Sequence, residues 1–207
     1  MCFSASASFI ASGILVVIGL FSVISAKERK WLFVALIPLF FAIQQCAEGL
    51  VWVYKSPIAA LAFLFFAFIV WPFYIPFSCL MVESDNARSR LLYALTIIGS
   101  GVSVCLLFGV LSSDLSFYIQ DCHIVYDAAG RLFTYGYMWV ALAGGYCMTT
   151  ILPFFISSHR YMKIMGILIG CSCLIAYLFY TVYFVSVWCF FAALISSAVL
   201  VIVRKNR

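Results

Sequence analysis

The feature that most limits what this chain can fold into is a series of long apolar runs with almost no charge inside them. Seven can be counted: Ser8–Ile24, Trp31–Tyr54, Ile58–Val82, Leu91–Leu111, Leu132–Ile156, Tyr161–Tyr180 and Phe184–Val203. Each run comes near the roughly 20 residues that a helix needs to cross a bilayer, and the unbroken apolar character excludes the alternating pattern of a membrane β-barrel. The sequence therefore predicts an all-α integral membrane protein, a seven-transmembrane-helix bundle.

Composition leads to the same class. The chain is 67% hydrophobic and 9% charged, whereas soluble domains are about 45–50% apolar and about 25% charged. We expect residues 1–207 to form a single transmembrane helical domain whose surroundings are the lipid bilayer. Only Thr181–Tyr183 separates the last two runs, so a six-crossing bundle with one re-entrant run stays an alternative.

Basic residues predict the orientation of the bundle, because positively charged loops are retained in the cytoplasm. With seven crossings, ten of the twelve basic residues fall on one side: Lys27, Arg29, Lys30, Arg88, Arg90, Arg160, Lys163, Arg204, Lys205 and Arg207. Lys55 and Arg131 fall on the other. The N-terminus is therefore predicted outside and the C-terminus in the cytoplasm. The charges are scattered over short segments, which gives no continuous basic patch for nucleic acid.

The outer side then carries one sizeable loop, at 112–131. Its segment "FYIQDCHIVYD" has short apolar and aromatic runs on either side of Gln120 and Asp121, which is typical of a small hairpin capping the bundle. An irregular loop packed by its aromatic residues is the alternative. Cys2 and Cys122 are both predicted on this side, where a disulfide is permitted, and the sequence is compatible with a bridge or with two separate thiols.

Glu48 is the most unusual residue, because it places a carboxyl group inside the second apolar run. It precedes Tyr54 by six residues, so at 1.5 Å per residue it lies about 9 Å below the predicted outer end. Phe41, Gln45, Glu48 and Trp52 recur at spacings of four, three and four, which places them on one helical stripe. A carboxylate in contact with lipid is costly, so this stripe is expected to face protein or water.

Two interpretations of Glu48 stay open. It is either a hydrogen-bonded clamp between helices, with the glutamines as further links, or part of a functional pocket. For the second interpretation the candidate outer binding residues are Gln44, Gln45, Glu48, Trp52, His123 and Trp188.

Several common kinds of site find no support. Neither His123 nor His159 lies well inside an apolar run, so haem ligation between helices and a serine–histidine dyad lack a ligand or base. The triplet Asp121, Cys122, His123 is weak evidence for a metal. We therefore predict no cofactor, no metal site and no catalytic set.

Four segments resemble a known family. They are the opening "MCFSASASF", "IPLFFAIQQCAEGLVW" at 37–52, "HIVY" at 123–126 and "SVWCFFAA" at 186–193, and they resemble, in the same order, a family of uncharacterised bacterial multi-pass membrane proteins. The resemblance implies a location in the bacterial inner membrane and a helical bundle, with no established activity. All four segments map to the predicted outer half.

The function expected from these observations is the binding of a small molecule or ion in an outer polar and aromatic pocket around Glu48, for transport or sensing. A membrane enzyme that uses Glu48 as general acid or base is one alternative. A structural subunit of a membrane complex, with protein partners that the sequence does not identify, is the other.

Overall fold

The computed structural model describes residues 4–112, 116–127 and 136–205. Seven helical segments in it are long and apolar enough to cross a membrane, and this confirms the predicted number. The helices are α1 (Ala5–Ser25), α2 (Arg29–Ala35), α3 (Ile37–Tyr54), α4 (Pro57–Leu64), α5 (Trp71–Val82), α6 (Asn86–Ser112), α7 (Gly136–Ile156), α8 (Arg160–Phe179), α9 (Phe184–Ser196) and α10 (Val199–Lys205). The last two spans are joined by a short 3-10 turn, η3 (Thr181–Tyr183).

The second span is divided into two helices near its beginning. Its two parts, α2 and α3, are separated only by Leu36, and Pro38 occupies the first turn of α3. Proline is tolerated at this place because the first N–H groups of a helix have no partner inside the helix. The seventh span has a similar interruption between α9 and α10, at residues 197–198.

The third span contains a π-helical segment, η1 (Phe65–Val70), directly before the Trp71–Pro72 pair. Proline lacks the N–H that would close the regular helical bond, and a widened turn is one way to absorb the mismatch. The Tyr146 hydroxyl donates to the carbonyl of Ala67 at 2.5 Å, and the Ser103 hydroxyl donates to the carbonyl of Ile69 at 2.7 Å. Side chains of α7 and α6 thus bind carbonyl groups of the irregular turn, which would be costly to leave without partners inside a membrane span.

The chain divides into two compact units. The first contains residues 1–63, 117–125 and 167–207, and the second contains residues 64–116 and 126–166. The single-domain organisation expected from the sequence stays a prediction.

In the first unit α1 packs antiparallel against α3 through small residues. The side chain of Leu39 lies where a Cβ on Gly19 would be, at 2.6 Å, and the Ser12 hydroxyl donates to the carbonyl of Ala42 at 2.8 Å. Small residues let membrane helices approach closely. Close packing matters there because the hydrophobic effect does not drive helices together inside a lipid bilayer. α9 lies against α1 and α3, and α10 lies against α1 and α2.

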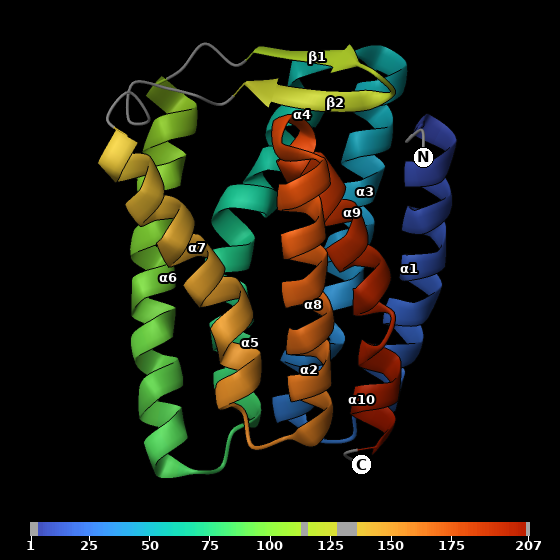
Figure 1. The fold of residues 1–207 in the computed structure, drawn as a ribbon. Helices are drawn as coiled ribbons and strands as arrows, with labels where there is room; N and C mark the ends of the chain where they lie inside the picture. The colour runs from blue at the N-terminus through green and yellow to red at the C-terminus, as the bar shows by residue number, and fades with distance from the viewer. Residues whose placement is uncertain (1–3, 113–115, 128–135, 206–207) are drawn as a thin grey trace. The chain divides into compact units, whose positions relative to one another are not determined.

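The predicted outer loop contains two paired strands, β1 (Ser116–Gln120) and β2 (His123–Asp127). The two residues between them, Asp121 and Cys122, both have positive φ, at 48° and 59°. Positive φ at both central residues is the geometry of a type I′ turn, whose twist matches that of paired strands. In the first unit, Figure 1 shows the hairpin at the same end as the start of α1, and α10 ends at the opposite end.

In the second unit the helices α5, α6 and α7 pack together. Pro76 has no N–H to donate to the carbonyl of Pro72, one turn earlier, and Gly99 of α6 lies directly on that carbonyl. A Cβ on Gly99 would fall 1.9 Å from the Pro72 oxygen. A glycine is therefore required at this contact between α5 and α6.

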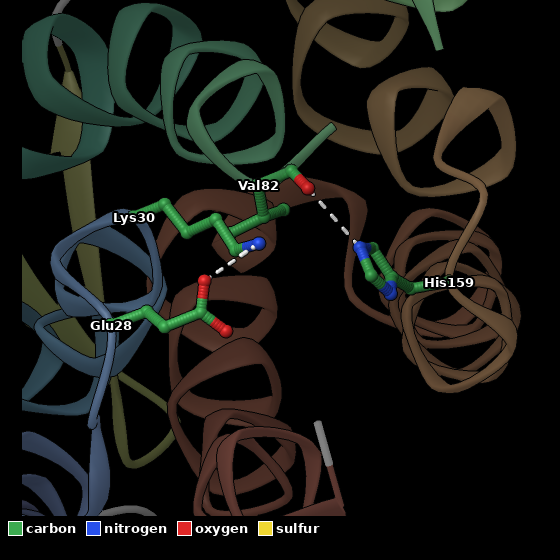
Figure 2. Close-up of polar contacts among 4 residues, drawn as sticks. All are labelled: Glu28, Lys30, Val82 and His159. Carbon is green, nitrogen blue, oxygen red and sulfur yellow. Dashed lines mark hydrogen bonds and ion pairs between the residues drawn. The ribbon is translucent and has the colours of Figure 1, made fainter. Parts of the chain in front are cut away.

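Polar contacts join two connections at one end of the second unit. The Glu83 carboxylate accepts hydrogen bonds from the backbone N–H and the hydroxyl of Ser158, each at 2.7 Å. His159 Nε2 lies 3.2 Å from the carbonyl oxygen of Val82, as drawn in Figure 2. The α5–α6 and α7–α8 connections are thereby held to each other. Figure 2 also draws a contact within the first unit, the exposed ion pair between Lys30 and Glu28 at 2.8 Å.

Candidate functional site

Glu48 is buried inside the first unit, with 2% of its surface exposed. Its carboxyl group accepts a hydrogen bond from the Ser186 hydroxyl of α9 at 2.5 Å and another from the Ser8 hydroxyl of α1 at 3.4 Å. The two bonds go to different carboxyl oxygens. Three helices therefore meet at this carboxyl group, and the polar stripe of α3 faces protein, one of the two environments expected for it.

The position of Ser8 follows from the small residues along α1. Ser8, Ser12, Leu15, Gly19 and Ser22 are buried and recur every three or four residues, so they form one face of the helix. The Phe9 ring packs closely on α3 because residue 49, next to Glu48 in the sequence, is glycine: a Cβ there would lie 2.7 Å from a ring atom of Phe9. Close approach of α1 and α3 is what brings the Ser8 hydroxyl to the carboxyl group.

Ser186 reaches the same carboxyl group from the first turn of α9. The buried face of this helix is again rich in small residues, with Ser186, Cys189, Ala193 and Ser196 at spacings of three and four. The free N–H groups in the first turn of a helix favour negative charge nearby, by at most about 2 kcal/mol. That is less than the several kcal/mol that burial of an ionised carboxylate costs.

Among the described residues, no lysine, arginine or histidine lies within ion-pair distance of Glu48 to compensate a negative charge. The ion pair of the described residues joins Lys30 and Glu28 instead. Of the acidic residues that the structure describes, Glu48 is the one that falls inside a candidate span. An uncompensated carboxylate in the interior of a membrane protein needs a proton or another cation.

The two glutamines are fully buried and differ in their surroundings. The Gln44 side chain lies within hydrogen-bonding reach of the Cys189 thiol. The Gln45 amide group is a hydrogen-bonding neighbour of Glu48 on the same helical face, and its carbonyl oxygen has no hydrogen-bond partner among the described residues. A buried amide in this state costs free energy and is therefore a candidate ligand-binding group.

Trp52 and Trp188, the two tryptophans predicted to belong to the binding site, lie close to Glu48 and Ser186 along their helices. Trp52 lies one turn after Glu48, is partly buried, and its indole nitrogen has no hydrogen-bond partner within the described parts of the chain. Trp188 follows Ser186 in α9, is buried, and packs against Phe184 with ring centroids 5.3 Å apart. These side chains supply an aromatic element near the carboxyl group.

His123 belongs to a separate aromatic cluster formed with the α8–α9 link. Its ring is buried, stacks on Tyr183 at 4.4 Å and lies 5.5 Å from the Tyr180 ring. The Tyr183 hydroxyl donates to the Asp121 carboxylate at 2.9 Å, and His123 Nδ1 lies 2.7 Å from the backbone carbonyl oxygen of Asp121. The described contacts of His123 therefore attach the hairpin to the start of the seventh span.

No group of three or more histidine, cysteine, aspartate or glutamate side chains within the described ranges is arranged to hold a metal ion. Cys122 is exposed at the turn of the hairpin. Cys2 and Arg131 lie outside the described residues, so a Cys2–Cys122 bridge stays untested.

Ser8 and Ser186 are the residues of the site that the sequence analysis did not single out. Both lie in segments that it did, "MCFSASASF" and "SVWCFFAA". The signal that could have found them is the recurrence of small residues every three or four positions in α1 and α9, which marks a helix-packing face.

Comparison with known proteins places the whole chain in one group. A family model described as a family of unknown function, DUF6629, matches residues 1–207. The chain belongs to the DUF6629 family. This membership confirms the resemblance to an uncharacterised family, whose description assigns no function. Comparison with curated proteins gives no match, and comparison with solved structures gives none either. Any function must therefore be argued from the Glu48 site itself.

Proposed function

We propose that this member of the DUF6629 family is a multi-pass protein of a bacterial inner membrane that binds a small molecule or ion at Glu48, for transport or sensing. The carboxyl group of Glu48 is the binding element, and Gln45, Ser8 and Ser186 are the polar groups around it. The binding site lies in the half of the first unit that contains the hairpin.

One observation carries this proposal. Glu48 is a buried carboxyl group without a basic partner among the described residues, and it is held by hydroxyl groups from two other helices. Acidic residues inside membrane spans are costly, and their usual role is to bind a substrate or an ion. Among the described residues the buried carbonyl oxygen of Gln45 has no hydrogen-bond partner, and this supports binding over simple clamping, because a clamp would leave no buried polar atom unused.

The proposed orientation has the N-terminus outside and the C-terminus in the cytoplasm. In the first unit, α2 begins with Arg29 and Lys30, and α10, which lies against α2, ends with Arg204 and Lys205. In the second unit, Arg88 at the start of α6 donates to Ser158, directly before the start of α8. Each unit thus gathers basic residues at one end, which supports a cytoplasmic location for those ends.

The aromatic candidates have secondary roles in this proposal. In this proposal Trp52, one turn after Glu48, lines the approach from the hairpin end, and Trp188, two residues after Ser186 in α9, packs on the other side of the site. His123 holds the hairpin to the α8–α9 link through Tyr180 and Tyr183. Lipid contact is supported by the exposed apolar side chains of the helices, for example Ile24 and Ile58.

The test is a thermal-unfolding screen of the purified full-length protein against small ions, amines, amino acids and sugars. At least one compound should raise the unfolding midpoint of the parent and leave Glu48→Gln unchanged. If every compound that stabilises the parent stabilises Glu48→Gln equally, the site is not at Glu48. Turnover of a lipid headgroup that Glu48→Gln abolishes would instead identify an enzyme.

A further inference from the structure

We propose that the ligand at Glu48 is a monovalent metal cation, sodium in the first instance, and that it exchanges with a proton on the same carboxyl group. This inference rests on the proposed function and narrows its ligand class. The exchange is balanced in charge: the cation binds the carboxylate as the proton leaves to water, and the reverse step restores the neutral acid.

The single negative charge of an ionised Glu48 favours a monovalent cation over a divalent one. Glu48 is the acidic residue inside a candidate span, and no basic side chain among the described residues lies within ion-pair distance of it. A single positive charge makes the buried site neutral, whether a proton or a sodium ion supplies it. A divalent ion would leave one positive charge uncompensated in the interior, and calcium and magnesium sites accordingly use several carboxylates or phosphates.

The surrounding atoms are oxygen donors suited to a hard cation. The hydroxyl groups of Ser8 and Ser186 both contact the carboxyl oxygens, and rotation of each hydroxyl would turn a lone pair toward an ion. The carbonyl oxygen of Gln45 is buried without a partner within the described ranges. Carboxylate, carbonyl and hydroxyl oxygens together match the preference of hard cations, and no soft ligand is needed.

Space favours an ion over an organic ligand. Each carboxyl oxygen already has a hydroxyl group against it, and the side chain is almost fully buried. An organic molecule would have to separate α1, α3 and α9 to reach the carboxyl group, whereas a single ion requires only that the hydroxyl groups rotate and that the oxygen atoms move a small distance apart.

The titratable side chains on the helices around Glu48 offer no better group for the proton exchange than Glu48 itself. α1 carries no titratable side chain, and α9 contributes only Cys189, which lies beside the Gln44 amide. α2 carries Arg29 and Lys30 in its first turn, at the far end of the span from Glu48. α3 itself adds Cys46 and Tyr54.

The experiment measures thermal unfolding of the full-length protein at constant ionic strength in sodium, lithium, potassium or N-methyl-D-glucamine chloride. At about pH 9, sodium should raise the midpoint in a saturable way, by about 5–10 °C at 100 times the dissociation constant. At about pH 6 the effect should shrink because the proton competes for the carboxylate. Equal midpoints in all four salts at both pH values would overturn the inference.

Variants identify the ligands. Ser8→Ala, Ser186→Ala and Gln45→Leu should each lower the apparent sodium affinity, by about tenfold or more. The matched controls are Ser12→Ala and Ser196→Ala, because these buried serines donate to backbone carbonyls and do not contact Glu48. Controls that lose affinity as strongly as the three site variants would also overturn the inference.

A second measurement avoids any variant that fails to fold. A hydrophobic carbodiimide should modify Glu48 in the parent, and sodium should slow this modification while N-methyl-D-glucamine does not. Labelling unaffected by sodium contradicts the inference. If sodium is without effect but another compound stabilises the parent through Glu48, the ligand class proposed here is wrong and the proposed function stands. If no compound acts through Glu48, both are wrong.

Discussion

The Ser186 hydroxyl donates a 2.5 Å hydrogen bond to Oε1 of Glu48, joining residues 138 positions apart. The bond links the second and seventh spans at a buried carboxyl group. Substitutions can distinguish two roles of this group, a clamp between helices and a ligand-binding site.

Two substitutions at Glu48 distinguish the clamp from the ligand-binding site. Glu48→Gln should keep the fold, because glutamine is nearly isosteric: its carbonyl oxygen can accept from one hydroxyl group and its NH2 group can donate to the other. The same substitution should change any ligand-dependent stability. Glu48→Leu should destabilise the protein by about 1–3 kcal/mol for each buried polar group left without a partner. Thermal unfolding with and without ligand measures both. A Glu48→Leu variant as stable and responsive as the parent would contradict the clamp and the site alike.

The contact of Gly99 with the Pro72 carbonyl should tolerate no side chain. Gly99→Ala would place a Cβ 1.9 Å from a backbone oxygen, so α5 and α6 must separate, at a cost of about 1–3 kcal/mol. Gly101→Ala is the matched control, because a Cβ there meets nothing within 4 Å and alanine favours the helix. Thermal unfolding should give a lower midpoint only for Gly99→Ala. Equal midpoints would mean that the two helices are not in this contact.

Glu83 should make stability depend on acid pH. Burial alone raises the pKa of this carboxyl, but hydrogen bonds from the Ser158 hydroxyl and from the backbone N–H groups of Asp85, Ser158 and Ser84 outweigh it, and the pKa is lowered. The stabilisation is therefore complete above the ordinary glutamate value of about 4.3 and is lost as pH falls through the lower folded value.

The measurement for Glu83 is the unfolding midpoint from about pH 6 to about pH 3. Glu83→Gln should have a lower midpoint at the upper pH and a shallower acid decline. Glu28→Gln serves as control, since its exposed ion pair with Lys30 contributes at most about 1 kcal/mol. The same acid decline in Glu83→Gln as in the parent would show that other groups cause it.

The hairpin turn should gain stability from glycine at position 122. Cys122 has a φ of 59°, a conformation that glycine adopts without the steric cost that a Cβ brings. Cys122→Gly should slow amide exchange in β1 and β2, corresponding to about 1 kcal/mol of local stability. Cys122→Ala is the control and should not. Faster exchange in the glycine variant would contradict the turn geometry.

The orientation can be tested on one helix. α6 has 27 residues, or about 40 Å, with Ser89 in its first turns and Ser116 a few residues beyond its end. In a background lacking the nine cysteines, a membrane-impermeant thiol reagent added to intact cells should label Ser116→Cys and not Ser89→Cys. The reverse labelling would overturn the proposed orientation.

The features that could be predicted from the sequence are those that each helix determines by itself. The number of spans and the burial of the Phe41, Gln45 and Glu48 stripe follow from apolar length and helical spacing, which are local properties. The contacts of Glu48 with Ser8 and Ser186 depend on which helices become neighbours, and no local pattern fixes that. The π-helical turn at residues 65–70 was also missed. Its carbonyl groups accept hydrogen bonds from Tyr146 and Ser103 on other helices, and such contacts are not specified by the local sequence.

The joint between α1, α3 and α9 also sets an order for biogenesis. Synthesis proceeds from the N-terminus, so the Ser8 and Glu48 side chains can meet when only the first two spans have entered the membrane. Ser186 arrives with the seventh span. Until then the carboxyl group lacks its shorter hydrogen bond, and the nascent bundle keeps a polar group that is not fully satisfied. A truncated or stalled product would retain that exposed acid, a chemical mark by which membrane quality control can distinguish unfinished molecules from finished ones.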